Sequence, residues 1–132
     1  MAEPYKFELV SPERLLVSEQ VEYVIIPGTE GEMTVMARHA PVMTAVKPGV
    51  VTVKTIAGKE DRYVVFGGFA DILPEGCTLL AESAVATGSI DREDLARRIQ
   101  DAREDVADAK DDQSRTKAEQ YLSHLTTLEA AI

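Results

Sequence analysis

The side chains of this chain that could perform chemistry are few, and the first candidates lie in a glycine-rich segment. Residues 28–32 read Gly-Thr-Glu-Gly-Glu. No Lys or Ser follows in the arrangement of a phosphate-binding loop, and two glutamates would repel a phosphate. The segment is therefore predicted to be an exposed acidic turn, with contact to a partner as its functional alternative.

The metal-ligating and nucleophilic residues are equally sparse. His39 and His124 are the only histidines and lie far apart, so they do not form the clustered ligand set of a metal site. Neither has a Ser or Cys placed as a nucleophile in a recognisable turn. The single cysteine, Cys77, excludes an internal disulfide and precedes an apolar run at 78–81. We expect no active site, a structural or interface role for His39, a solvated position for His124, and a small core residue at Cys77.

The elements that position these residues change character at Gly88. All eight glycines and all six prolines lie at or before it, among short apolar runs that alternate as β-strands do. One strand is expected to bury the face of Val21, Tyr23 and Ile25. Turns are predicted at Ser11-Pro12, Lys47-Pro48-Gly49, Ala57-Gly58-Lys59 and Pro74-Glu75-Gly76. The strands are short and closely spaced, which favours an antiparallel sandwich or a flattened barrel.

The remaining residues, 88–132, are predicted to be helical. Asp91 and Asp94 resemble a capping box at the start of a helix. Two apolar stripes at helical spacing follow, and they are separated by the polar residues 111–114. The stripes comprise Leu95, Ile99, Ala102, Val106 and Ala109, and then Ala118, Tyr121, Leu122, Leu125, Leu128 and Ile132. No Gly or Pro forces the break, so a hairpin and an extended helix both remain open.

Composition and charge restrict the class of protein. The formal net charge is −9 over 132 residues, which argues against nucleic-acid binding and against adsorption to anionic lipid. The N-terminus has no apolar region of a secretory signal, and no apolar run approaches the length of a membrane span. A soluble, cytosolic protein is expected, connected to a membrane only through partners.

An ordered set of motifs resembles a known family. It comprises 11–14 (Ser-Pro-Glu-Arg), 27–33 (Pro-Gly-Thr-Glu-Gly-Glu-Met), 39–44 (His-Ala-Pro-Val-Met-Thr), 47–49 (Lys-Pro-Gly), 67–70 (Gly-Gly-Phe-Ala) and 80–82 (Leu-Ala-Glu). In this order and spacing, they resemble the epsilon subunit of the F-type proton-translocating ATP synthase, the counterpart of mitochondrial delta. The resemblance covers essentially the whole chain.

This resemblance implies a ten-stranded β-sandwich over 1–87 followed by an αα-hairpin over 88–132. It implies a non-catalytic central-stalk subunit, without a cofactor, that binds the gamma subunit and the c-ring at the cytoplasmic face of the bacterial inner membrane. The loop expected to face the c-ring comprises Gly28, Thr29, Glu30, Gly31, Glu32, Arg38 and His39. The residues expected to face gamma are Ala40, Pro41, Val42, Met43, Gly67, Gly68 and Phe69.

The tail is expected to carry regulation, through contact with the alpha and beta catalytic subunits. Its candidate residues are Asp91, Asp94, Arg115 and Lys117. In nucleotide-binding members of the family an arginine stands at the position of Asp94, where it would pair with phosphate, so ATP binding is not expected here. The second helix offers only Arg115 and Lys117, with His124, where inhibitory tails are usually more basic, so strong inhibition is not expected either. Two other classes are a free-standing regulatory β module with a nucleotide-sensing tail and a metal-binding barrel enzyme. The lack of paired histidines disfavours the second.

Overall fold

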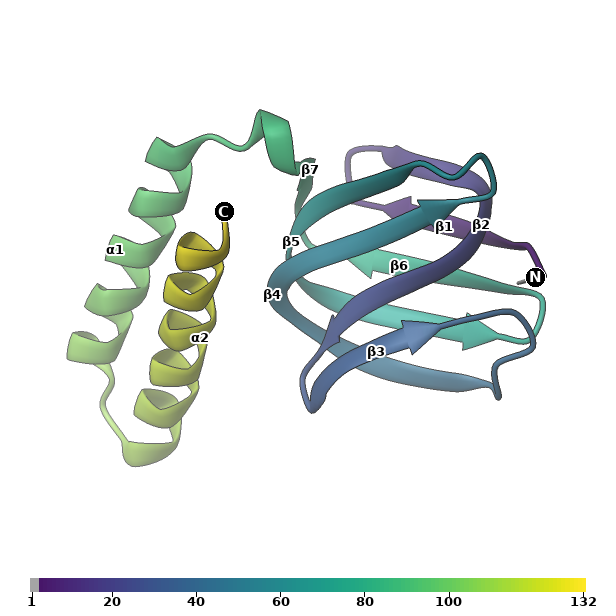
Figure 1. The fold of residues 1–132 in the computed structure, drawn as a ribbon. Coiled ribbons are helices and arrows are strands. Elements are labelled where there is room, and N and C mark those ends of the chain that lie inside the picture. The colour runs from purple at the N-terminus through teal and green to yellow at the C-terminus, as the bar shows by residue number, and fades with distance from the viewer. Residues whose placement is uncertain (1–2) are drawn as a thin grey trace. The chain divides into compact units, whose positions relative to one another are not determined.

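The computed structural model describes residues 3–132, which form two compact units (Figure 1). One unit ends at Thr87 and contains strands only, whereas the other begins at Gly88 and contains two helices. The strands are β1 (Tyr5–Val10), β2 (Leu15–Gly28), β3 (Gly31–Val35), β4 (Val42–Thr55), β5 (Glu60–Leu73), β6 (Gly76–Ala81) and β7 (Ala84–Ala86). A short 3₁₀ turn, η1 (Thr87–Ser89), precedes the helices α1 (Arg92–Asp108) and α2 (Asp112–Ala131).

The sheet of the first unit closes on itself. Its strand order is β1-β6-β5-β4-β2-β3, and β1 also pairs with β2, so five strands form a ring. The β1–β6 pair is parallel and the other pairs are antiparallel, while β3 and β7 are attached to β2 and β5. Closure leaves the ring without a free edge. The predicted sandwich or flattened barrel is confirmed.

The structure has seven strands in the described residues, where the resemblance implied ten. Three strands, β2, β4 and β5, are each 14 residues long. β2 pairs with β1 through its first half and with β3 and β4 through its second half. β5 likewise pairs with β7 at residues 63–65 and with β6 at residues 68–73, so one continuous strand pairs with different neighbours along its length.

The predicted turn at Lys47-Pro48-Gly49 is wrong, because these residues lie inside β4. The β4–β5 register continues through them, with Pro48 opposite Phe66 and Gly49 opposite Val65. A Cβ on Gly49 would lie 2.8 Å from Cβ of Pro27 on β2. Proline and glycine therefore mark a close approach of two strands here, a role that glycine also takes in other sheets.

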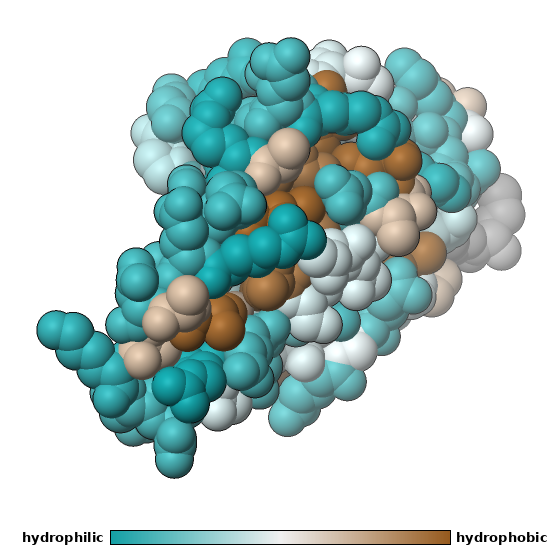
Figure 2. All heavy atoms as spheres, turned by 90° about the vertical axis from the view of Figure 1, so that its left-hand side faces the viewer, coloured by the Kyte–Doolittle hydropathy of each residue, from teal (hydrophilic) through white to brown (hydrophobic). Residues whose placement is uncertain are grey.

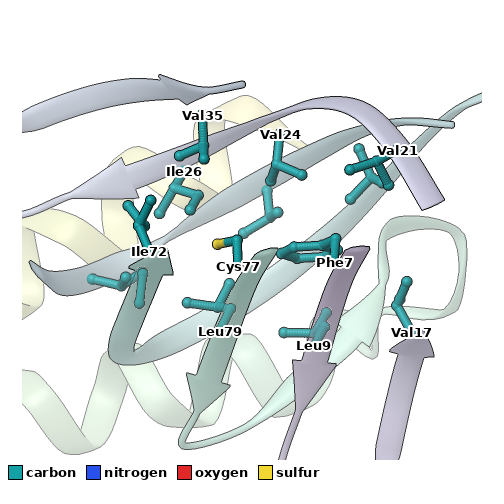
Figure 3. Close-up of a cluster of buried hydrophobic side chains, with 14 of the residues drawn as sticks. Phe7, Leu9, Val17, Val21, Val24, Ile26, Val35, Ile72, Cys77 and Leu79 are labelled. Atoms are coloured by element: carbon teal, nitrogen blue, oxygen red, sulfur yellow. The ribbon is translucent and has the colours of Figure 1, made fainter. Parts of the chain in front are cut away.

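The core of the β unit is apolar and is drawn from all the strands of the ring. Val21, Val24 and Ile26 of β2 point toward Phe7, Cys77 and Leu79 of β1 and β6 (Figure 3). The expectation that Tyr23 and Ile25 share the buried face with Val21 is wrong, since both are only half-buried. The β2–β4 register shifts between Val21 and Tyr23, and this bulge moves the buried face by one residue.

The second unit is a hairpin of α1 and α2, so the structure selects one of the two arrangements left open (Figure 1). Asp91 caps α1 by accepting hydrogen bonds from the backbone N–H groups of Glu93 and Asp94, at 2.9 and 3.3 Å. Asp111 caps α2, accepting from the Ser114 N–H at 2.7 Å. The break lies at 109–111, and residues 112–114 form the first turn of α2.

The predicted apolar stripes form the packed side of the helices. Leu95, Ile99 and Ala102 of α1 are buried, as are Leu125 and Leu128 of α2. The other predicted positions of both stripes are half-buried. The stripes are confirmed, and they are narrow, as the alanine-rich spacing indicates.

Candidate functional site

The candidate metal and nucleophile residues do not form a reactive centre. Among residues 3–132, no group of three or more His, Cys, Asp or Glu side chains could hold a metal ion. His39 lies in the loop after β3, where its Nδ1 is 2.9 Å from the carbonyl oxygen of Ala40. His124 lies in α2 and is half-buried, which is less solvated than predicted. The two histidines therefore belong to different units.

Cys77 lies in the β core, as predicted. Burial raises the pKa of its thiol to about 12, so the thiolate is scarce at neutral pH. Reactive cysteines have lowered pKa values and partial exposure. Cys77 is thus a packing residue.

The acidic hairpin, residues 28–32, is built by its two glycines. Gly28 pairs with Gly31 across the β2–β3 ladder, so Thr29 and Glu30 form a two-residue loop. Gly31 has a φ of 130°, and a Cβ on Gly28 would lie 2.8 Å from the Gly31 carbonyl oxygen. Both positions therefore favour glycine. Glu30 and Glu32 are exposed at the tip, which confirms the predicted acidic turn.

Arg38 and His39 follow the end of β3 opposite to the acidic hairpin. A five-residue strand spans on the order of 15 Å, so the seven residues expected in one c-ring-facing loop form two groups along one edge. Arg38 has a φ of 63° and pairs with Glu3, its Nε lying 3.0 Å from the Glu3 Oε2. Sequence reasoning did not anticipate this partner.

A row of apolar side chains, three of them exposed and two half-buried, crosses five strands on the outer face of the β unit. Directly paired residues point to the same face of a sheet. Val10 is paired with both Leu15 and Leu80, Leu80 with Phe69, and Phe69 with Ala45. We call these five residues the apolar row. Leu15, Phe69 and Leu80 are 52%, 57% and 52% exposed, respectively.

A shallow groove of about 340 Å³ lies along this row, lined by Val10, Ser11, Pro12, Gly68, Phe69, Leu80, Ala81 and Glu82. The backbone of β5 at the groove requires glycine at position 68. The φ of Gly68 is 145°, and a Cβ on this residue would lie 2.0 Å from the Leu80 carbonyl oxygen. Among the residues expected to face gamma, Gly67 and Gly68 therefore shape β5, while Phe69 offers a side chain. Met43 of β4 is 69% exposed, and Val42 is also exposed.

Sequence reasoning identified Phe69 and missed Val10, Leu15 and Leu80. The sequence did contain a signal for Val10 and Leu80. Leu9-Val10 and Leu79-Leu80 are consecutive apolar residues within strands, and neighbours in a strand point to opposite faces. One member of each pair must therefore face outward. The register that aligns them into a row depends on pairings between distant segments.

The candidate residues of the tail hold the helices locally. Asp94 accepts from Arg97 at 3.2 Å and from Arg98 at 3.0 Å. Arg115 lies 3.7 Å from Asp112, and Lys117 is exposed. Figure 2 is viewed from the side on which Figure 1 draws α1 and α2. The surface in this view is largely hydrophilic and carries a narrow hydrophobic stripe. The described helices include none that is both long and apolar enough to cross a membrane.

Comparison with known proteins decides the family. The model of the β-sandwich domain of the ATP synthase delta/epsilon chain matches residues 4–87. This chain belongs to the ATP synthase delta/epsilon family. It is 80% identical over 132 residues to the ATP synthase epsilon chain of Mesorhizobium japonicum, covering 100% of this chain and 98% of that protein. It is 63% identical over 132 residues to the epsilon chain of Chelativorans sp., with the same coverage.

Solved structures agree with this family assignment. The chain matches a subunit of the Euglena gracilis mitochondrial ATP synthase, in a structure of its OSCP, F1 and c-ring, with a TM-score of 0.75 and 32% identity. That match covers 97% of this chain and 81% of the other. A central-stalk/c-ring structure from Tetrahymena thermophila matches with a TM-score of 0.59, 11% identity and 96% coverage of both chains, which supports the fold alone.

Proposed function

We propose that this chain is a non-catalytic rotor subunit of the central stalk of a proton-translocating ATP synthase. In this role it binds the gamma subunit and the c-ring and helps couple proton flow to rotary ATP synthesis. The observation that carries the proposal is the apolar row on the outer face of a closed sheet. Family membership supports the same assignment.

The apolar row suits a permanent protein contact. Large exposed apolar patches on a soluble domain mark interaction sites. Leu15, Phe69 and Leu80 are each about half exposed, so covering them would contribute about 1 kcal/mol per side chain. We assign this surface, with Met43 at its margin, to the gamma subunit. A rigid closed sheet would then move with gamma as one body.

The acidic hairpin suits a different contact. Glu30 and Glu32 are exposed on a tight, glycine-defined turn, where charge can set register more than affinity. We assign the hairpin to the polar loops of the c-ring. On this proposal the chain is peripheral at the cytoplasmic face of the bacterial inner membrane, and it reaches the membrane through these partners.

The test is co-purification with the complex. Phe69→Asp combined with Leu80→Asp should strip the subunit from detergent-solubilised ATP synthase, because two charges would be buried without partners. Ile56→Asp is the matched control, since Ile56 is 55% exposed in the β4–β5 turn, outside the apolar row. Retention of the double variant at the wild-type level would rule out this docking surface.

A further inference from the structure

Residues 3–5 contact the chain at two points: at the end of β3, and three residues later in the β3–β4 loop. The Tyr5 hydroxyl donates a hydrogen bond of 2.6 Å to the carbonyl oxygen of Val35, the last residue of β3. Two residues before Tyr5, both carboxylate oxygens of Glu3 contact the Arg38 guanidinium. The Arg38 Nε lies 3.0 Å from Oε2, and its Nη2 donates to Oε1 at 3.3 Å.

Arg38 adopts a backbone conformation that its residue type avoids. Its φ of 63° is the one positive value at a non-glycine position among residues 3–132. This left-handed region crowds the Cβ of an L-residue. The Arg38 N–H donates a hydrogen bond of 2.9 Å to the carbonyl oxygen of Pro74, between β5 and β6. The conformation therefore depends on contacts outside the loop.

Three segments that are distant in the sequence meet at this point. Residues 3–5, 37–38 and 74–75 line one cleft of about 340 Å³. Tyr5 is buried within the core cluster, so its end of the segment is anchored. Pro4 fixes the backbone between Tyr5 and Glu3, which limits where the Glu3 carboxylate can lie.

We propose that Glu3 is a positioning residue that, through Arg38, holds the β3–β4 loop in the conformation that presents His39 to the stalk. This inference rests on the proposed function and on the expectation from the family resemblance that Arg38 and His39 face the c-ring and residues 40–43 face gamma. Glu3 and Arg38 are both exposed, so their pair adds little to global stability. The Glu3–Arg38 pair instead raises the population of one conformation of the β3–β4 loop.

The ion pair with Glu3 also changes the role expected of Arg38, which was direct contact with the c-ring. Its charge is compensated within the chain by Glu3, and its guanidinium fork is occupied at two nitrogens. Arg38 therefore shapes the loop, while His39 and the start of β4 are offered to a partner.

The first experiment uses the full chain without partners. Hydrogen exchange of the Arg38 amide should accelerate about two- to five-fold in Glu3→Ala, the factor expected from loss of an exposed ion pair. Glu13→Ala is the matched control, since Glu13 is also exposed but lies between β1 and β2. The charge-swapped double variant Glu3→Arg with Arg38→Glu should return the exchange rate toward wild type. Equal exchange in Glu3→Ala and Glu13→Ala would overturn the proposal.

The second experiment measures binding to ATP synthase depleted of this subunit. Glu3→Ala should weaken binding by about the same two- to five-fold, and the charge swap should restore it. Phe69→Asp is measured in the same assay. If Phe69→Asp binds normally, the proposed docking function has failed, while the exchange result still decides whether Glu3 holds the loop. If Phe69→Asp weakens binding and Glu3→Ala does not, the positioning role is overturned.

Discussion

In the β unit, the contacts that define the candidate surfaces join residues far apart in the sequence, such as Tyr5 with Val35 and Val10 with Leu80. In the helical unit, the caps and the ion pairs of Asp94 and Arg115 join residues no more than four positions apart. A change in the first unit should therefore spread through several strands. A change in the second should alter one helix turn or the hairpin alone.

The largest expected effect is that of Gly68→Ala. The added Cβ would lie 2.0 Å from the Leu80 carbonyl oxygen, so β5 and β6 must separate or the backbone at position 68 must leave its positive φ. We expect destabilisation of the β unit by about 3 kcal/mol or more, measured by chemical denaturation. Gly58→Ala is the control, because Gly58 has a φ of 87° and no atom within 4 Å of the added Cβ. Its cost should be about 1 kcal/mol. Equal costs would show that strand packing at Gly68 is not the constraint.

Next in size is Leu95→Ala in α1. Leu95 is 1% exposed, and truncating such a side chain costs about 2–5 kcal/mol. The helical unit has few buried residues, so this loss should melt the hairpin and lower the helical circular dichroism signal at 222 nm. Cooperative unfolding of the β unit, followed by hydrogen exchange of its strand amides, should change far less. A matching shift of both transitions would contradict the contrast between the two units.

A smaller effect is expected from acid on the α2 cap. Hydrogen bonds from the Ser114 N–H and hydroxyl lower the pKa of Asp111 from its ordinary 3.8. Because the folded pKa lies below the unfolded one, the cap stabilises fully above pH 3.8, and this contribution is lost as the pH falls through the folded pKa. Helicity should therefore decline in that acidic range. Asp111→Asn should abolish this component while keeping the cap, since Asn caps as well as Asp. An identical acid titration in Asp111→Asn would contradict it.

The smallest effect is expected from the tail on catalysis and nucleotide binding. Asp94 already pairs with Arg97 and Arg98, so the start of α1 offers a carboxylate where a phosphate would need a free cation. Titration of the full chain with ATP should show no binding below millimolar concentration. Deleting residues 88–132 should leave a folded β unit and change ATP hydrolysis by the complex little. Micromolar binding, or activation by many-fold on deletion, would show that the tail regulates strongly.

Much of the helical unit could be predicted because its signals are local. Asp91 caps its own helix, and the stripe from Leu95 to Ala102 follows from the helical repeat. The placement of Cys77 in the core and the acidic turn at 28–32 also follow from neighbouring residues. These features depend on a few consecutive side chains, so the sequence alone determined them.

Tertiary structure decided what depends on pairing between distant strands. Because of the bulge in β2, Val24 and not Tyr23 lies on the buried face. Pro48, where a turn was predicted, lies inside β4 opposite Phe66. The apolar row exists because five strands align in one register, and Arg38 meets Glu3 only when the sheet has closed. The sequence of a strand indicates which of its side chains share a face. It does not state which partner stands opposite, because that choice is made by the packing of the whole sheet.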